Sequence, residues 1–349
     1  MFGELVYGMG PAGVWVSFVV CLLLILLTGA RLSRHGNAIA VRTGLGGVWV
    51  GLVLVAAVTS LPELVTGLSA ILVVGQPDLA VGAALGSCVY NLVIIAVLDF
   101  IYRPGTIYSG IQHGHSLSAG FSVVLLGAAA SALFVHSELA AINVGPIGPY
   151  SIAAPIIYFI AMRSVFFYER REKTAMLGGL SGARALREAG ALPLAKSYVW
   201  FAVNALVLMA AATALPMIGE ALALMMGWEE TFVGTIFLAF VTSLPEIVIS
   251  VEAVRIGAVD LAIGGILGSN LFDLLILAVE DFAYVDGPIL AVASSQHLLT
   301  SIAALTMTGI VIVGLYSRPR TRVFRVVSWA SLGLLIVAVF TALFLFLLG

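Results

Sequence analysis

The sequence is divided into about ten apolar stretches, each long enough to cross a bilayer as a helix of about 20 residues. These stretches are 12–30, 38–74, 77–101, 116–135, 149–168, 197–218, 229–256, 259–284, 288–315 and 324–348. In lipid, only helices and closed barrels satisfy their own backbone hydrogen bonds. The short alternating segments of a barrel do not occur. We therefore predict an all-α polytopic membrane protein.

Charged residues are scarce. They make up 10% of the 349 residues, with 16 Lys+Arg and 18 Asp+Glu, and the mean hydropathy is +1.14. A soluble domain carries about 25% charged residues, so the composition excludes a soluble enzyme, a nucleic-acid binder and a disordered chain. The two cysteines, Cys21 and Cys88, lie in apolar stretches, and we interpret them as packing residues.

The positive charges predict the orientation. All 16 Lys and Arg lie in or beside alternate loops, namely 31–42, 102–115, 169–196, 255–260 and 316–323. Cytoplasmic loops carry the excess of Lys and Arg in membrane proteins. We therefore expect these loops to be cytoplasmic, both termini to be outside, and the chain to lie in a prokaryotic plasma (inner) membrane.

One segment occurs twice. Residues 51–63 (GLVLVAAVTSLPE) match 234–246 (GTIFLAFVTSLPE), and the following stretches 78–91 and 260–273 match at an offset of 182. We predict two five-helix repeats, the second inverted because five is odd. The first is 1–168 with its motif in 51–99, the second is 197–349 with its motif in 234–281, and loop 169–196 joins them. Inverted repeats with interrupted helices typically mark a transporter's substrate site near the midplane.

Glu63 and Glu246 lie at matching positions deep in apolar stretches. A charge at the bilayer centre costs about 2.5–3.5 kcal/mol on insertion scales, so two such residues indicate a function. Each follows a proline, which has no N–H and disrupts the helical ladder before it. The hydroxyls at the two breaks are those of Thr59, Ser60, Thr242 and Ser243. Carboxylates, hydroxyls and freed carbonyls together predict a cation site.

The next stretch of each repeat adds more oxygen ligands. Ser87 and Asn91 are i,i+4 neighbours, as are Ser269 and Asp273, so each pair shares one helix face. Small-residue faces precede them, at Gly82 and Gly86 in the first repeat and at Gly264 and Gly268 in the second. Hard oxygen donors suit Ca²⁺ and Na⁺, whereas Zn²⁺ and Cu⁺ prefer nitrogen or sulfur.

The motif pairs TSLPE…GSCVYN and TSLPE…GSNLFD resemble the two α-repeats of the sodium/calcium exchanger family, among the calcium/cation antiporters. The resemblance is specific over 51–99 and 234–281, and it implies ten spans and Ca²⁺ and Na⁺ as transported ions, with no other cofactor. The ion ligands that it implies are Glu63, Glu246, Thr59, Thr242, Ser60, Ser243, Ser87, Asn91, Ser269, Asp273 and the carbonyls of Ala56 and Ala239. The chain departs from the family pattern at Cys88, where Asn is usual, and at Asp99, Glu280 and Asp281, where Gly or an apolar residue is expected.

We expect a secondary antiporter that exchanges Ca²⁺ for Na⁺ by alternating access, with inorganic cations and the lipid bilayer as its partners. Proton/calcium antiport differs only in the coupling ion and stays open, as does a cation channel. An intramembrane hydrolase is a further alternative, but the sequence has no H-E-x-x-H, no G-x-S-x-G and no Ser/His pairing at the motifs. Outside the site, we expect Glu252 to pair with a partner in the cytoplasmic half, such as Arg255, and we interpret His113 and His115 as solvated loop residues.

Overall fold

The computed structural model describes residues 10–138, 147–176, 193–226, 242–323 and 326–348. Nine helices in these ranges are long and apolar enough to cross a membrane. The described residues contain no strand, and an isolated bridge joins Val323 and Val327. The predicted all-α membrane fold is therefore confirmed. The first part of the remaining predicted span, 229–241, lies outside the described residues, and the part from residue 242 onward is placed.

The first half of the chain contains a membrane-length helix, Gly47–Val74, that is divided into five short elements, and we call it the broken helix. In chain order, the elements of the first half are α2 (Gly10–Thr43), α3 (Gly47–Val50), η1 (Gly51–Val55), α4 (Ala56–Thr59), α5 (Leu61–Ser69), η2 (Ala70–Val74), α6 (Pro77–Ile101), η3 (Ile107–Ser109), α7 (Gly114–Glu138) and α8 (Pro149–Met176). The broken helix comprises those from α3 to η2. The prediction of a loop at 31–42 was wrong, because α2 continues to Thr43. The chain turns instead at Gly44 and Gly46, whose φ values of 72° and 88° favour glycine.

The second half has the same order of elements. It contains α10 (Leu194–Met226), α13 (Leu244–Arg255), α14 (Val259–Ala283), α15 (Ile289–Val292), α16 (Gln296–Ser317) and α17 (Trp329–Leu348). The predicted span 288–315 is divided, since the single turn α15 precedes the long helix α16. The predicted loop 169–196 is shorter at both ends, because α8 extends to Met176 and α10 begins at Leu194.

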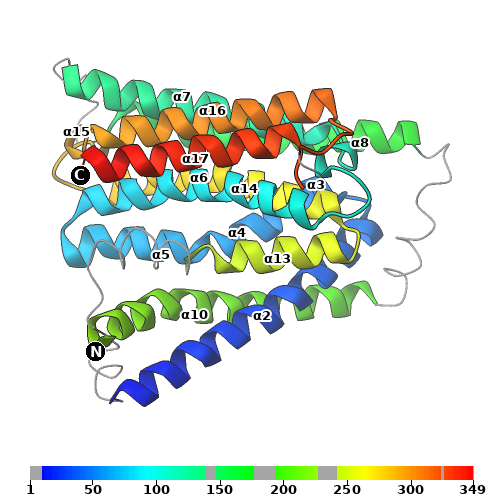
Figure 1. Ribbon diagram of the computed structural model, residues 1–349, viewed down its shortest axis with the longest axis horizontal. Coiled ribbons are helices and arrows are strands. Elements are labelled where there is room, and N and C mark those ends of the chain that lie inside the picture. Colours follow the sequence, from blue (N-terminus) through cyan, green and yellow to red (C-terminus); the bar gives the residue numbers. More distant parts are fainter. Residues whose placement is uncertain (1–9, 139–146, 177–192, 227–241, 324–325, 349) are drawn as a thin grey trace.

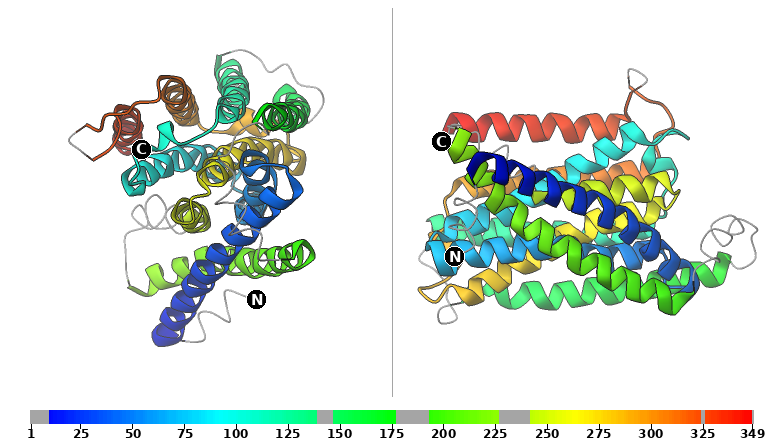
Figure 2. Two further views of the ribbon diagram at one scale, coloured as in Figure 1. Left: turned by 90° about the vertical axis from the view of Figure 1, so that its right-hand side faces the viewer. Right: turned by 90° about the horizontal axis from the view of Figure 1, so that it is seen from below.

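The helices form layers across the bundle. Helices α2 and α10 pack against each other along one side, while α7, α8, α16 and α17 lie on the other side (Figures 1 and 2). The broken helix, α6, α13 and α14 lie between these layers. Helix α14 is central, and most of its residues are buried. We refer to the two ends of the bundle by the short helices found there, as the α3 end and the α15 end.

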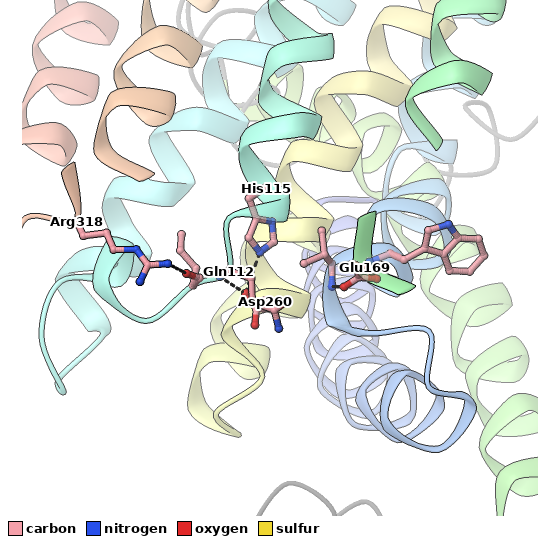
Figure 3. A network of polar contacts seen from close by, with 8 residues as sticks. Gln112, His115, Glu169, Asp260 and Arg318 are labelled. Atoms are coloured by element: carbon pink, nitrogen blue, oxygen red, sulfur yellow. Dashed lines mark hydrogen bonds and ion pairs between the residues drawn. The ribbon is translucent and has the colours of Figure 1, made fainter. Parts of the chain in front are cut away.

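Helices α6 and α14 run in opposite directions, and matching contacts occur at opposite ends of the bundle. Each begins with an aspartate whose Oδ1 accepts a hydrogen bond from a backbone N–H at 2.6–2.9 Å and contacts a histidine Nε2 at 3.0 Å. Each member of one set lies 182 positions from its counterpart in the other set, and Figure 3 shows the set at the α3 end. The sets are Asp260 with Gln112 and His115 at the α3 end, and Asp78 with Ser294 and His297 at the α15 end.

His115 is completely buried in the first turn of α7. The interpretation of His115 as a solvated loop residue was therefore wrong, whereas His113 is exposed. The imidazole of His115 is held by Asp260, a residue that lies 145 positions away in the sequence.

Helices α6 and α14 also end on matching carboxylates. Asp99 Oδ1 accepts from the Ile107 N–H at 2.7 Å, and Asp281 Oδ1 accepts from the Ile289 N–H at 2.5 Å. The second oxygen of Asp99 accepts from the Ser328 N–H just before α17, and that of Asp281 from the Gly148 N–H just before α8. Each carboxylate therefore ties the loop after its helix to the start of the last helix of a repeat.

Two further acidic residues have structural roles. Glu169 of α8 accepts from the N–H groups of Val48 and Trp49 at 3.1 and 3.0 Å, which fixes the start of the broken helix (Figure 3). Glu252 forms an ion pair with Arg34 of α2 at 2.9 Å. The partner is therefore an arginine of the predicted cytoplasmic half, but it is Arg34 rather than Arg255, because the packing of α2 on α13 brings a distant arginine closer.

Candidate cation-binding site

The two motifs have the same backbone conformation at the serine, which we call the kink. Ser60 has φ −89° and ψ 0°, and Ser243 has φ −83° and ψ 3°. A Leu-Pro pair follows each serine, and Pro62 has no N–H to offer to the carbonyl of Val58. Both helices then restart with equivalent bonds, from the Leu64 N–H to the Ser60 carbonyl and from the Ile247 N–H to the Ser243 carbonyl, each 3.2 Å. The sequence motif thus produces the same kink twice.

Helix α14 crosses the first motif at very close range. A Cβ at Gly264 would lie 2.7 Å from the Val48 carbonyl oxygen, and one at Gly268 would lie 2.6 Å from that of Leu52. Only glycine allows this approach of helix to backbone. The predicted packing role of this small-residue face is confirmed for α14. It brings Ser269 and Asp273 beside the kink in the first motif.

Side chains from the two repeats meet at the kink. The hydroxyls of Thr59 and Ser269 are 3.1 Å apart, and the Glu246 carboxyl lies beside the Thr59 hydroxyl. One turn further along α14, Asn91 Nδ2 donates to Asp273 Oδ2 at 3.1 Å. Residues that lie about 180 positions apart in the sequence therefore line one site.

Next to this site, the amide of Asn270 donates to the Cys88 carbonyl at 3.3 Å, and the Cys88 thiol contacts the Asn270 carbonyl at 3.8 Å. Cys88 is fully buried and is not in a disulfide. Its predicted role in packing is confirmed. Cys88 and Asn270 are equivalent residues of the two repeats, so α6 and α14 contact each other through matching positions.

The site contains buried oxygens that lack hydrogen-bond partners. Glu63, Glu246 and Asp273 are only 8%, 4% and 1% exposed. Among the described residues, one oxygen of each carboxyl is unpartnered, together with the hydroxyl of Ser60: these atoms are Glu63 Oε2, Glu246 Oε2, Asp273 Oδ1 and Ser60 Oγ. The three carboxyls are near enough to interact electrostatically. Buried polar groups are normally satisfied, so this cluster has the properties of a cation site.

The donor set determines the class of ion. In the described part of the chain, no three His, Cys, Asp or Glu side chains form a metal site by themselves. Coordination at the kink therefore requires hydroxyl, amide and carbonyl oxygens in addition to the carboxylates. Such mixed oxygen sites suit Ca²⁺, which takes six to eight flexible oxygen ligands.

The other predicted ligands differ in burial and in whether they lie in the described residues. Ser243 is buried at the second kink. Ala56 is buried, and its carbonyl accepts from the Ser60 N–H at 2.9 Å and the Thr59 hydroxyl at 3.2 Å. Ser87 and Thr242 are only partly buried. Ala239 lies outside the described residues.

Several polar contacts at the ends of α6 and α14 were not predicted. Asp99 and Asp281 had no predicted role, although both fix loops, and neither did the aspartate–histidine contacts at the starts of α6 and α14. Each of these residues has an equivalent 182 positions away with the same identity: Asp78 and Asp260, Asp99 and Asp281, His115 and His297. Extending the repeat comparison beyond the motifs could have identified them.

Comparison with known proteins agrees with this geometry. The family model described as sodium/calcium exchanger protein matches residues 13–167 and 196–344. Inner membrane protein YrbG of Escherichia coli (strain K12) is 29% identical over 260 residues, which cover 74% of this chain and 76% of YrbG. Sodium/calcium exchanger MaX1 of Methanosarcina acetivorans is 39% identical over 61 residues, 17% of each chain.

The fold is also that of a known exchanger structure. The sodium-calcium exchanger NCX_Mj, soaked with Na⁺ and Ca²⁺, superposes with a TM-score of 0.70 over 94% of this chain and 97% of NCX_Mj, at 16% identity. That likeness concerns the fold. Together with the family match over most of the chain, it identifies an integral membrane transporter that is not an enzyme, and the chain belongs to the sodium/calcium exchanger family.

Proposed function

We propose that this protein is a secondary-active antiporter that exchanges Ca²⁺ for Na⁺ by alternating access. The observation that carries the proposal is the group of buried, unpartnered oxygens contributed by Glu63, Glu246 and Asp273 at the two kinks. The names of the family and of its relatives MaX1 and NCX_Mj support Ca²⁺ and Na⁺ as the exchanged ions.

The buried carboxylates provide the physical basis for exchange. Neighbouring carboxylates cannot all remain ionised in a low dielectric without strong repulsion. They therefore require Ca²⁺, Na⁺ or protons, and these cations compete for the same oxygens. A ligand shifts a conformational equilibrium only through different affinities for the two states. The empty, charged site is costly to move, which couples the passage of one ion to that of the other.

We propose that α2 and α10 move against the rest of the bundle during transport. The two helices form a separate layer in Figure 2 and pack mainly on each other. Helix α2 contacts the second motif helix through the Ser33 hydroxyl, which donates to the Ile249 carbonyl at 2.7 Å, and through the Arg34–Glu252 ion pair. These contacts place the layer directly against the segment that follows Glu246.

We also propose that the α3 end is cytoplasmic and that both termini lie outside. Every described Lys and Arg lies in the half of its helix nearer the α3 end or in a loop at that end. Because cytoplasmic loops carry the excess of positive charge, this distribution supports the orientation. The name of the relative YrbG supports an inner membrane.

The test is counter-ion dependence in proteoliposomes. Vesicles loaded with Na⁺ and diluted into Na⁺-free buffer are expected to accumulate ⁴⁵Ca²⁺, whereas vesicles loaded with choline are not. Uptake driven by a pH gradient in the absence of Na⁺ would assign proton/calcium antiport instead. Equal uptake without any counter-ion would indicate a channel and contradict the proposal.

A further inference from the structure

Glu280 is a buried acid outside the site described above. It lies near the α15 end of α14 and is 1% exposed. Its Oε2 has no hydrogen-bond partner, and no Lys or Arg among the described residues forms an ion pair with it. An ionised carboxylate buried without a partner is strongly destabilising. Glu280 therefore requires a bound cation or a proton.

The space for this carboxyl comes from a glycine on the first motif helix. Gly67 lies on α5, four residues and about one turn beyond Glu63. A Cβ at Gly67 would overlap Glu280 Oε1 and would lie 2.8 Å from its Cδ. The carboxyl of Glu280 thus fills the position of the missing side chain, against the helix that carries Glu63.

Glu280 also lies between the central site and the α15 end. It follows Asp273 by seven residues, which is about two turns or roughly 10 Å on the same face of α14. Gly67 follows Ser60 by the same interval on α5, which runs in the same direction. The carboxyls of Asp273 and Glu280 interact electrostatically.

The other end of the bundle has no matching acid. The equivalent of Glu280 in the first repeat is Leu98, and the equivalent of Gly67 in the second repeat is Ser250. Leu98 is fully buried and Ser250 is 3% exposed. The Glu280 position therefore carries a carboxylate in the second repeat, toward the α15 end, but a leucine in the first, which makes the two routes to the site chemically different.

We propose that Glu280 forms a second cation-binding position, which holds Ca²⁺ or Na⁺ between the α15 end and the Glu63–Asp273 site. The inference rests on the proposed function, because it requires that cations reach the central site from this end. A cation at Glu280 neutralises the buried charge, and the negative charge of Glu280 raises the local concentration of cations entering from that side.

Transport measured separately from each side of the membrane tests this position. Right-side-out and everted membrane vesicles present Ca²⁺ to opposite ends of the protein, and an Asp286→Cys reporter in the exposed segment after α14 identifies which vesicles expose the α15 end. Glu280→Gln is expected to weaken the apparent Ca²⁺ affinity at the α15 end about tenfold, equivalent to about 1.4 kcal/mol. The affinity at the α3 end should change by less than about twofold, well below that tenfold step.

Control variants distinguish an effect of the Glu280 charge from an effect on the protein structure. Glutamine keeps the shape and donor capacity of a protonated carboxyl, so a purely structural Glu280 predicts no change in Glu280→Gln. Gly67→Ala keeps the charge but displaces the carboxyl, and it should reproduce the one-sided loss. The Asp286→Cys reporter alone, which removes an exposed acid near the α15 end, should leave the affinity at both ends unchanged. An unchanged Glu280→Gln, or an equal loss at both ends, would overturn the inference.

A binding measurement distinguishes this inference from the proposed function. Calorimetry with CaCl₂ on the purified Glu246→Gln protein in detergent should detect a weak residual site that is lost in the Glu246→Gln/Glu280→Gln double variant. Identical isotherms for the single and double variants would reject a site at Glu280. If the parent protein exchanges no cations in either type of vesicle, the proposed function fails instead, whatever the isotherms show.

Discussion

Asn91 donates a hydrogen bond to Asp273 at 3.1 Å, and the two residues occupy equivalent positions in the two repeats. Equivalent residues meet in this way only where the pseudo-symmetry axis passes between α6 and α14, as it also does at Cys88 and Asn270. Two carboxylates at this separation would repel each other. The amide instead supplies a donor to one oxygen of Asp273, while the other oxygen stays available to a cation.

The two motif glutamates are expected to be indispensable. Glu63→Gln and Glu246→Gln each remove a charge from the buried oxygen cluster, so both should reduce Na⁺-driven ⁴⁵Ca²⁺ uptake by at least about 100-fold, equivalent to about 2.7 kcal/mol. Proteoliposome flux measures this effect, and Asp286→Asn, at an exposed position, provides the control for the loss of a carboxylate away from the site. Near-normal flux in both motif variants would refute the site.

The close packing of α14 can be tested with a single methyl group. Gly268→Ala places a Cβ against the Leu52 carbonyl at 2.6 Å, so we expect destabilisation of about 1–3 kcal/mol from overpacking, together with loss of transport. Gly309→Ala in α16 is the control, because a Cβ there meets nothing within 4 Å. Thermal unfolding in detergent reports the difference. Equal melting temperatures for the two variants would contradict the proximity of α14 to the broken helix.

The histidines near the start of α7 should differ in importance. His115→Ala removes a buried partner of Asp260, so the unfolding temperature should fall by an amount equivalent to about 1–3 kcal/mol. His113→Ala, two residues earlier and exposed, should have little effect. Because His297 contacts Asp78 in the same manner, His297→Ala should resemble His115→Ala, with a smaller effect because Asp78 is 52% exposed.

The carboxylate at the end of α14 should stabilise the fold. Both oxygens of Asp281 accept from backbone N–H groups, and an asparagine would present its NH₂ to one of these donors. We expect Asp281→Asn to lower stability by about 1.5–3 kcal/mol, the range for a hydrogen bond to a charged group. Asp286→Asn, at an exposed position, serves as the matched control. A melting curve for Asp281→Asn equal to that of Asp286→Asn would exclude this role.

Sequence periodicity located helices better than it located their ends. The apolar stretch 12–30 predicted a helix, but α2 extends to Thr43, because Arg31 and Arg34 project from a helix that continues beyond its apolar part. The stretch 288–315 likewise concealed a break after α15. Charge and hydropathy indicate where a helix can lie in lipid, whereas the ends are set by turns such as Gly44 and Gly46 and by tertiary hydrogen bonds such as those to Asp281.

The sequence alone determined the membrane fold, the duplicated motif and the identity of the central acids, because scarce charges in lipid and repeated kinks leave few alternatives. Only the tertiary structure decided which residues meet. It joined Asn91 to Asp273, paired Glu252 with Arg34 rather than Arg255, and turned His115 from a loop residue into the buried partner of Asp260. It also brought Glu280 into the space above Gly67. These contacts join segments more than 100 residues apart, and their formation depends on how the two halves of the chain pack together, which local sequence patterns do not encode.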